Sequence, residues 1–219
     1  MTRVKVCCVQ DVEEMALAVR HGTSALGLVS RMPSGPGVIE EAAIRGIASV
    51  IPPGVMSVLL TSERDPEAIV AQHRRCATNA LQLVDRVGSS ALREIRRALP
   101  GICILQVVHV TGPGSIEEAT AAAEHASALL LDSGNPDRPV KELGGTGKTH
   151  DWAVSRAICG AVPVPVYLAG GLTAVNVAEA IREVRPFGVD VCSGLRTDGR
   201  LVESKLGAFV AAVRGADAG

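Results

Sequence analysis

Short runs rich in Val, Leu and Ile alternate with longer amphipathic stretches along almost the whole chain. The expected strands cover residues 4–9, 25–30, 55–60, 80–84, 102–110, 128–132, 164–169 and 188–192. The expected helices follow near residues 11–21, 39–49, 65–76, 88–99, 115–125, 150–160, 173–184 and 202–213. Such alternation is typical of βα units around a parallel sheet. Eight units predict an α/β fold, a single (β/α)₈ TIM barrel, because a doubly wound sheet of about five or six strands would leave two units unexplained.

The domain organisation follows from the same count. A chain of 219 residues fits one large domain or two small ones. No linker or low-complexity segment interrupts the series, so we expect one barrel over residues 1–214 and a short C-terminal tail over 215–219.

Several helix starts carry capping residues. Asp11 and Asp65 precede the first and third expected helices, and a side-chain oxygen there can accept a backbone hydrogen bond. Ser115 and Glu118 have the spacing of a capping box, and Thr173 is expected to open the seventh helix.

The composition excludes several functions. Hydrophobic residues make up 47% of the chain but aromatic residues only 2%, so the core is aliphatic and base stacking is excluded. A net charge of −1 gives no reason to expect nucleic acid as a partner. No apolar run approaches the ~20 residues of a membrane span, and no signal segment is apparent, so we expect a cytoplasmic protein without a membrane partner. The six cysteines lack zinc-site spacing and are expected to be reduced thiols.

Glycine-rich segments follow the last three expected strands. In a barrel, the residues after the strands form the active site, and the loops after strands 7 and 8 often bind phosphate. Gly170 and Gly171 follow the seventh strand, and Ser193 and Gly194 follow the eighth. Glycine lets backbone N–H groups approach an anion, so these residues are candidates for phosphate binding, the alternative being glycines that serve only tight turns.

The segment Gly144-Gly145-Thr146-Gly147-Lys148-Thr149 superficially resembles a nucleotide-binding loop. The pattern G-x-x-x-x-G-K-[ST] requires a glycine six residues before Lys148, where the chain has Glu142. We therefore expect a glycine-rich lid over a small substrate, since long loops inside compact barrels are usually functional.

Two ionisable residues end strands on opposite sides of the expected barrel mouth. Cys7 lies at the end of the first strand and Asp132 at the end of the sixth. A thiol and a carboxyl so placed can divide proton transfer, one as base and one as acid. The alternatives are a buried apolar cysteine and a turn or N-cap aspartate.

Several segments together resemble the phosphoribosylanthranilate isomerase family of tryptophan biosynthesis. Lys5-Val6-Cys7-Cys8-Val9-Gln10 is similar to the family's K-I-C-G-[IL]-T opening. The further matches, in the family's order, are Leu131-Asp132-Ser133, Gly144-Gly145-Thr146-Gly147-Lys148-Thr149-His150-Asp151-Trp152, Leu168-Ala169-Gly170-Gly171-Leu172 and Val189-Asp190-Val191-Cys192-Ser193-Gly194. The resemblance spans nearly the whole chain.

The resemblance implies a cofactor-independent, metal-free aldose–ketose isomerase whose ligand is a phosphorylated aminosugar. Cys7 would be the general base and Asp132 the general acid of an Amadori rearrangement. Gln82, Gly145 and Gly147 would contact the substrate.

The departures from the family lie in the first half of the barrel. The family carries S-P-R after strand 2, where the arginine holds the anthranilate carboxylate, whereas this chain has Gly37 at that place. Arg31 in the same loop is the candidate replacement. Cys8 replaces a glycine and Gln10 a threonine, and the histidine that follows Gln82 in the family is lost.

These departures leave alternatives open. One is a paralogue that isomerises or binds another phosphorylated sugar, and another is a catalytically silent phosphate-binding barrel. The sequence allows a monomer or a homodimer.

Overall fold

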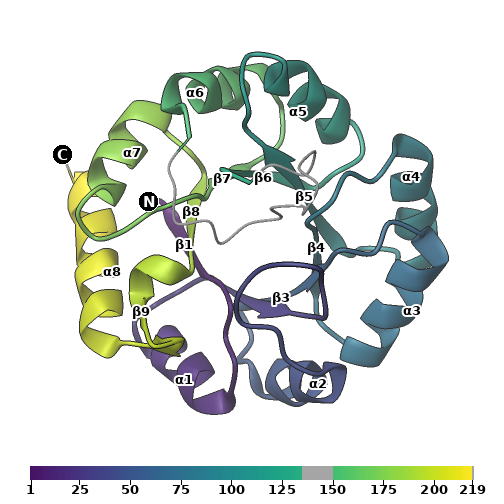
Figure 1. Cartoon of the computed structure of the whole chain (residues 1–219), viewed down its shortest axis with the longest axis horizontal. Helices are drawn as coiled ribbons and strands as arrows, with labels where there is room; N and C mark the ends of the chain where they lie inside the picture. Colours follow the sequence, from purple (N-terminus) through teal and green to yellow (C-terminus); the bar gives the residue numbers. More distant parts are fainter. Residues whose placement is uncertain (135–149, 219) are drawn as a thin grey trace.

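Eight parallel strands close into a barrel in the order β1 to β8, surrounded by helices (Figure 1). The computed structural model describes residues 1–134 and 150–218. The strands are β1 (Arg3–Val6), β2 (Ala25–Val29), β3 (Met56–Thr61), β4 (Ala80–Leu83), β5 (Cys103–His109), β6 (Ala128–Asp132), β7 (Val166–Leu168) and β8 (Gly188–Val191). The helices are α1 (Val12–Arg20), α2 (Glu41–Val50), α3 (Pro66–Cys76), α4 (Ser89–Ala98), α5 (Ser115–Ala123), α6 (Trp152–Ala161), α7 (Val177–Val184) and α8 (Glu203–Ala218). The predicted TIM barrel is confirmed.

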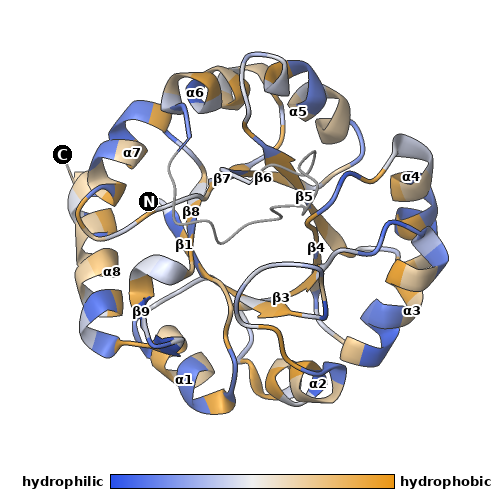
Figure 2. Cartoon of the chain, viewed as in Figure 1, coloured by the Kyte–Doolittle hydropathy of each residue, from blue (hydrophilic) through white to orange (hydrophobic). Residues whose placement is uncertain are grey.

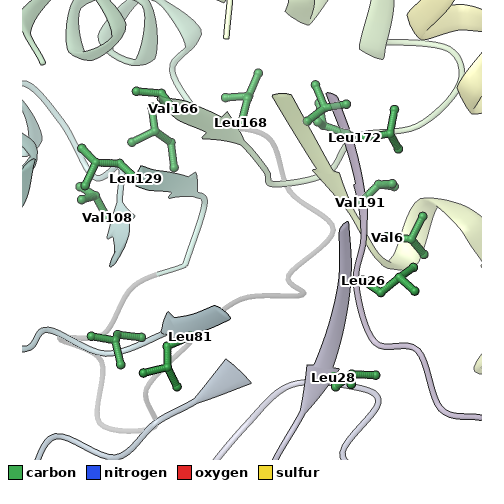
Figure 3. Close-up of a cluster of buried hydrophobic side chains, with 14 of the residues drawn as sticks. Val6, Leu26, Leu28, Leu81, Val108, Leu129, Val166, Leu168, Leu172 and Val191 are labelled. Carbon is green, nitrogen blue, oxygen red and sulfur yellow. The ribbon is translucent and has the colours of Figure 1, made fainter. Parts of the chain in front are cut away.

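Side chains alternate between the two faces of each strand, so the barrel has two apolar layers. Val6, Leu26 and Leu168 point outward and pack against the helices, as Figure 3 shows. Ala25 and Leu130 belong to the smaller cluster inside the barrel. The largely orange strands, with short blue segments, and the mixed colours of the helices in Figure 2 reflect this arrangement, because each helix buries only one face. Within the described residues, no helix is long and apolar enough to cross a membrane.

Two of the expected helix caps form as predicted. Asp11 accepts a hydrogen bond from Glu14 N at 2.8 Å, and Asp65 accepts one from Ala68 N, also at 2.8 Å.

The expected capping box at Ser115 and Glu118 is wrong. Gly114 is the N-cap of α5, and the Ser115 hydroxyl instead bonds His109 O and Thr111 N. The expected start of the seventh helix at Thr173 is also displaced. Residues 173–176 form a turn in which the Asn176 side chain accepts from Thr173 N, and α7 begins at Val177.

The C-terminal part of the chain differs from expectation in two ways. A 3₁₀ turn, η1 (Ser193–Leu195), and a small hairpin of β9 (Arg196–Thr197) and β10 (Arg200–Leu201) lie between β8 and α8. The expected tail at residues 215–219 is helical as far as the structure describes it, because α8 continues to Ala218. Asp217 on that helix accepts two hydrogen bonds of 2.7 Å from Thr2, which ties the end of the chain to its beginning.

Candidate active site

A hollow lies at the carboxyl ends of the strands, where a barrel enzyme places its active site. It brings together residues from both ends of the chain, because β1 pairs with β8. The described lining residues with polar or thiol side chains, or with glycine, are Cys7, Cys8, Ser34, Gly35, Gln82, Asp132, Gly170, Gly171, Asp190, Cys192 and Ser193. None of the described lining residues is aromatic, in keeping with the aromatic content of only 2%.

Cys7 follows β1 and faces the barrel interior. Its backbone N–H donates to Val191 O at 2.9 Å, which extends the pairing of β1 with β8. Lys5 lies two residues earlier, on the same face of the strand, and its ammonium donates to Asp190 Oδ1 at 2.9 Å. Lys5 is fully buried; although burial alone would lower its pKa, the negative charge of Asp190 raises it, so the lysine is charged.

Gly27 on β2 leaves room for the Cys7 thiol and the Lys5 ammonium, because it has no side chain. A Cβ built on Gly27 would lie 2.9 Å from Cys7 Sγ and 3.1 Å from Lys5 Nζ. The space that a side chain would fill is therefore taken by the two functional groups. The Cys7 thiol and the Lys5 ammonium therefore lie close together in the barrel mouth.

Asp132 ends β6 and is buried in the barrel mouth. Burial raises the pKa of its carboxyl, even though the Ser133 backbone N–H donates to Oδ1 at 2.7 Å and favours the charged form. A carboxyl with a raised pKa retains its proton to higher pH and can act as a general acid. The mouth thus holds a proton donor together with a thiol beside a buried cation.

Cys8 has a left-handed backbone, with φ of 64°. Glycine adopts this conformation without cost, which explains why a glycine would suit the position and why Cys8 is an unusual residue there. Gly37 of the loop after β2 packs directly on it: a Cβ at Gly37 would lie 2.5 Å from Cys8 Cβ. Gly37 itself has φ of 76°. The Cys8 side chain therefore occupies the space that any side chain at position 37 would need.

We expect Gly37→Ala to destabilise the fold by roughly 1–3 kcal/mol, through overpacking and a strained φ. In a Cys8→Gly background the cost should be smaller, because the 2.5 Å contact with Cys8 Cβ is gone and only the strained φ and the looser contacts with the residue 8 backbone, at 3.0 and 3.3 Å, remain. Urea unfolding of the two single variants and the double variant measures this coupling. If the two single-variant changes in the free energy of unfolding added up to that of the double variant, residues 8 and 37 would not share this space.

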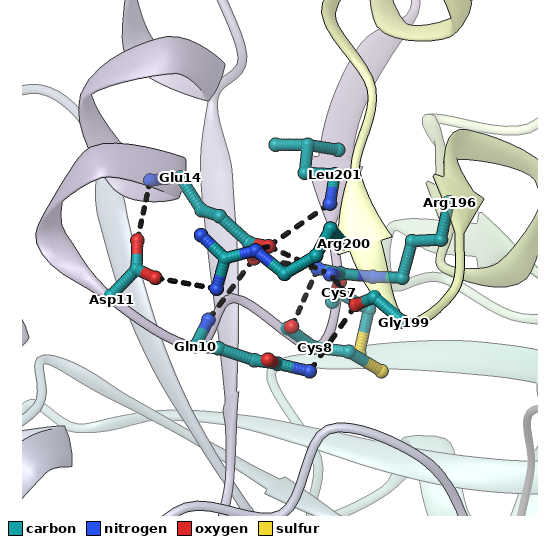
Figure 4. Close-up of polar contacts among 9 residues, drawn as sticks. All are labelled: Cys7, Cys8, Gln10, Asp11, Glu14, Arg196, Gly199, Arg200 and Leu201. Carbon is teal, nitrogen blue, oxygen red and sulfur yellow. Dashed lines mark hydrogen bonds and ion pairs between the residues drawn. The ribbon is translucent and has the colours of Figure 1, made fainter.

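Arg196 holds the backbone of the Cys7–Cys8 corner in a buried network (Figure 4). Its guanidinium donates to both carboxylate oxygens of Glu14, at 3.1 and 3.0 Å. It also donates to the carbonyl oxygens of Cys7 and Cys8, and to Gly199 O at 2.8 Å. Because the pair is planar and bidentate, it fixes both the orientation of the Arg196 guanidinium and its distance from the Glu14 carboxylate. The hairpin of β9 and β10 thus supports the loop that carries Cys7.

The glycine loops after β7 and β8 lie against each other beside the hollow. Gly170 and Gly171 have φ of 84° and 61°, a conformation that turns backbone groups toward an anion in many proteins. A Cβ on Gly194 would lie only 2.2 Å from Leu172 O, so that glycine is required for the contact between the two loops. Gly170, Gly171 and Ser193 line the hollow, while Gly194 packs behind them.

The remaining candidates are placed as follows. Gln82 on β4 lines the hollow, and its buried Oε1 has no hydrogen-bond partner among the described residues. Arg31 is exposed and borders a different depression, together with Glu41 and Arg75 on α2 and α3, so the structure does not bring it to the mouth. Gly145 and Gly147 lie outside the described residues.

Sequence reasoning missed Lys5, Asp190, Glu14 and Arg196 as parts of the site. The alternation of side chains along β1 could have identified Lys5, because Lys5 and Cys7 must lie on the same face of the strand. No local signal identifies the partners, since Lys5 and Asp190 are separated by 185 positions and Glu14 and Arg196 by 182.

Comparison with known proteins points to one family. Residues 4–212 match the family model of N-(5'-phosphoribosyl)anthranilate isomerase. The chain is 38% identical over 206 residues to the N-(5'-phosphoribosyl)anthranilate isomerase of Methanocella arvoryzae, covering 94% of each protein. It is 37% identical over 200 residues to that of Haloarcula marismortui, covering 91% of this chain and 89% of the relative.

Solved structures agree with these relatives. The crystal structure of phosphoribosyl anthranilate isomerase from Thermotoga maritima superposes with a TM-score of 0.84 and 30% identity, covering 98% of this chain and all of that one. A phosphoribosyl anthranilate isomerase in complex with reduced 1-(o-carboxyphenylamino)-1-deoxyribulose 5-phosphate superposes with a TM-score of 0.82 and 27% identity, with coverage of 98% and 100%.

Proposed function

Because the chain belongs to the N-(5'-phosphoribosyl)anthranilate isomerase family, we propose that it converts N-(5'-phosphoribosyl)anthranilate to the corresponding carboxyphenylamino-deoxyribulose phosphate, an Amadori rearrangement in tryptophan biosynthesis. The observation that carries the proposal is the barrel mouth itself. It holds Cys7 and the buried carboxyl of Asp132 beside two glycine loops.

The reaction needs one acid and one base. A proton from Asp132 to the ribose ring oxygen opens the aminoaldose to a Schiff base. Cys7 then removes the proton from C2, which gives an enolamine that tautomerises to the ketose. The raised pKa of Asp132 supports its role as acid, and the position of Cys7 in the mouth, next to the Lys5 ammonium, supports its role as base.

The substrate phosphate would bind at the loops after β7 and β8. Gly170, Gly171 and Ser193 line this side of the hollow, and Gly194 keeps the loops in contact. The amide of Gln82 would contact the rest of the substrate, since its oxygen is buried without a partner among the described residues. Contacts from Gly145 and Gly147, action in the cytoplasm and a monomeric or dimeric state remain predictions.

Growth of a tryptophan auxotroph that lacks this isomerase tests the proposal. We expect the wild-type gene to restore growth without tryptophan, and Cys7→Ser to fail, because a serine hydroxyl is a much weaker base than a thiolate. Cys159→Ser is the matched control, because Cys159 lies on the outer helix α6, away from the mouth, and should restore growth. A wild-type protein that is made in folded form yet supports no growth would contradict the proposal.

A further inference from the structure

Three thiols lie at the barrel mouth, and the reaction above uses only one of them. Cys7 and Cys8 follow β1, and Cys192 follows β8. The three line the same hollow, whereas Cys76, Cys103 and Cys159 do not. Two nucleophilic groups at the entrance are therefore left without a role in the isomerisation.

The strand register brings the thiols on the two strands together. Val6 pairs with Val191, so the residues that follow, Cys7 and Cys192, are neighbours across the two strands. Adjacent strands lie ~4.8 Å apart, and disulfides join Cα atoms ~4.4–6.8 Å apart. Cys8 comes next along the chain, and its left-handed backbone keeps its side chain in the cluster with Cys7 and Cys192.

The surroundings of Cys8 and Cys192 shift the pKa values of the two thiols in opposite directions. Interaction with the Cys8 thiol and the positive charge of Arg196 lower the pKa of Cys192, despite partial burial. Interactions with the thiols of Cys192 and Cys7, together with burial, raise the pKa of Cys8. Cys192 is also the more exposed of the two. A solvent-accessible thiol with a lowered pKa, beside a thiol with a raised pKa, is the arrangement of an oxidisable cysteine and its resolving partner.

We propose that Cys192 and Cys8 form a reversible disulfide in response to a hydroperoxide, and that this bridge closes the active site. The Cys192 thiolate attacks the O–O bond of the hydroperoxide, takes up one oxygen as a sulfenic acid and releases an alcohol or water after protonation. The Cys8 sulfur then attacks the Cys192 sulfur, and the Cys8 proton leaves with the displaced hydroxide as water. Two thiols and one hydroperoxide thus give one disulfide, one alcohol or water, and one further water.

The bridge would lie between β1 and β8, next to Cys7 and Ser193. Those residues are the proposed base and part of the proposed phosphate site, so we expect the bridge to obstruct substrate binding and lower turnover. This consequence rests on the proposed function, whereas the formation of the bridge does not.

The test treats the reduced wild-type protein with stoichiometric hydrogen peroxide, counts free thiols and maps the cross-link by mass spectrometry of protease digests. We expect the loss of two thiols and a link between the peptide containing Cys7 and Cys8 and the peptide containing Cys192. Because Cys7 and Cys8 share a peptide, Cys7→Ser identifies the partner: the link should persist in this variant and disappear in Cys8→Gly. Glycine suits the left-handed backbone at position 8, so this variant preserves the fold. Cys192→Ser should form no link, and Cys159→Ser should behave like the wild type.

A bridge between Cys7 and Cys8, a link that persists in Cys8→Gly, or no cross-link at all would overturn the proposal. Isomerase activity provides the second measurement. In the wild type it should fall by about tenfold or more on oxidation and recover with dithiothreitol, while oxidised Cys192→Ser retains the activity of its own reduced form. A mapped bridge with unchanged turnover would overturn the closure of the site. If the reduced protein has no isomerase activity, the proposed function fails, yet the mapping still decides whether the bridge forms.

Discussion

Asp132→Asn is expected to lower kcat by about 10²-fold or more, since a positioned general acid contributes ~10²–10⁴-fold. Asparagine keeps the oxygen that accepts the Ser133 N–H but cannot protonate the ribose ring oxygen. In the wild type, activity should fall as the pH rises through the pKa of Asp132. Because burial raises that pKa, the fall should occur at higher pH than for an ordinary aspartate. Steady-state kinetics over a pH series measure both effects.

The same substitution should not destabilise the protein at neutral pH. A carboxyl whose pKa is raised by folding contributes stability below its unfolded pKa of ~3.9 and loses that contribution as the pH rises through the folded value. At pH 7 the carboxyl of Asp132 ionises freely in the unfolded chain, whereas folding buries it at a cost. Asparagine has no ionisable group to bury, so the melting temperature of the variant should equal or exceed that of the wild type. Asp65→Asn, which keeps an exposed helix cap, is the control for activity. A variant with wild-type kcat would remove Asp132 from the mechanism.

Lys5→Met should destabilise the fold by about 3–5 kcal/mol, because it leaves the Asp190 carboxylate buried without its partner. The Lys5 side chain is fully buried and Asp190 is only 8% exposed, so solvent does not screen the loss. Urea unfolding at pH 7 measures the change in the free energy of unfolding.

The double variant Lys5→Met with Asp190→Asn is the control for this prediction. It removes both charges and should be more stable than Lys5→Met alone, because no unpaired carboxylate remains. Glu41→Gln breaks the exposed pair with Arg75 and should cost far less, because solvent screens that pair. If the single and double variants were equally stable, the Lys5–Asp190 pair would not have the energetic role assigned to it.

The barrel could be predicted from the sequence because each βα unit carries its own signal. Alternation along β6 places Leu129 and Leu131 outside and Leu130 and Asp132 inside, and no distant contact is needed to see this. The helix starts were less predictable. Asp65 caps α3 as expected, whereas Ser115 bonds to the strand end at His109 instead of capping α5. That choice depends on the tertiary position of the loop.

The sequence predicts those site residues whose position depends only on where a strand ends. Cys7, Gln82, Asp132 and the loop at Gly170 and Gly171 converge on one hollow, because parallel strands in a barrel end on the same side. Arg31 does not line this hollow, although Ser34 and Gly35 of the same loop do; it borders a depression beside α2 and α3 instead. A loop's path is set by tertiary contacts that periodicity does not report.

The buried ion pairs could not be predicted for a related reason. Strand periodicity places Lys5 inside the barrel, but an unpaired internal lysine gives no indication of which carboxylate neutralises it. That information comes only with closure of the barrel, when β8 brings Asp190 beside β1. The same closure allows Arg196 to support the Cys7–Cys8 corner.

Consumption of N-(5'-phosphoribosyl)anthranilate by the purified, reduced protein, followed by the loss of the substrate's fluorescence, tests the central claim most directly. We predict catalytic turnover by the wild type, with Cys7→Ser and Asp132→Asn each slower by about 10²-fold or more. A folded wild-type protein that leaves the fluorescence unchanged at micromolar enzyme concentration would contradict the assignment of this barrel as an isomerase of that substrate.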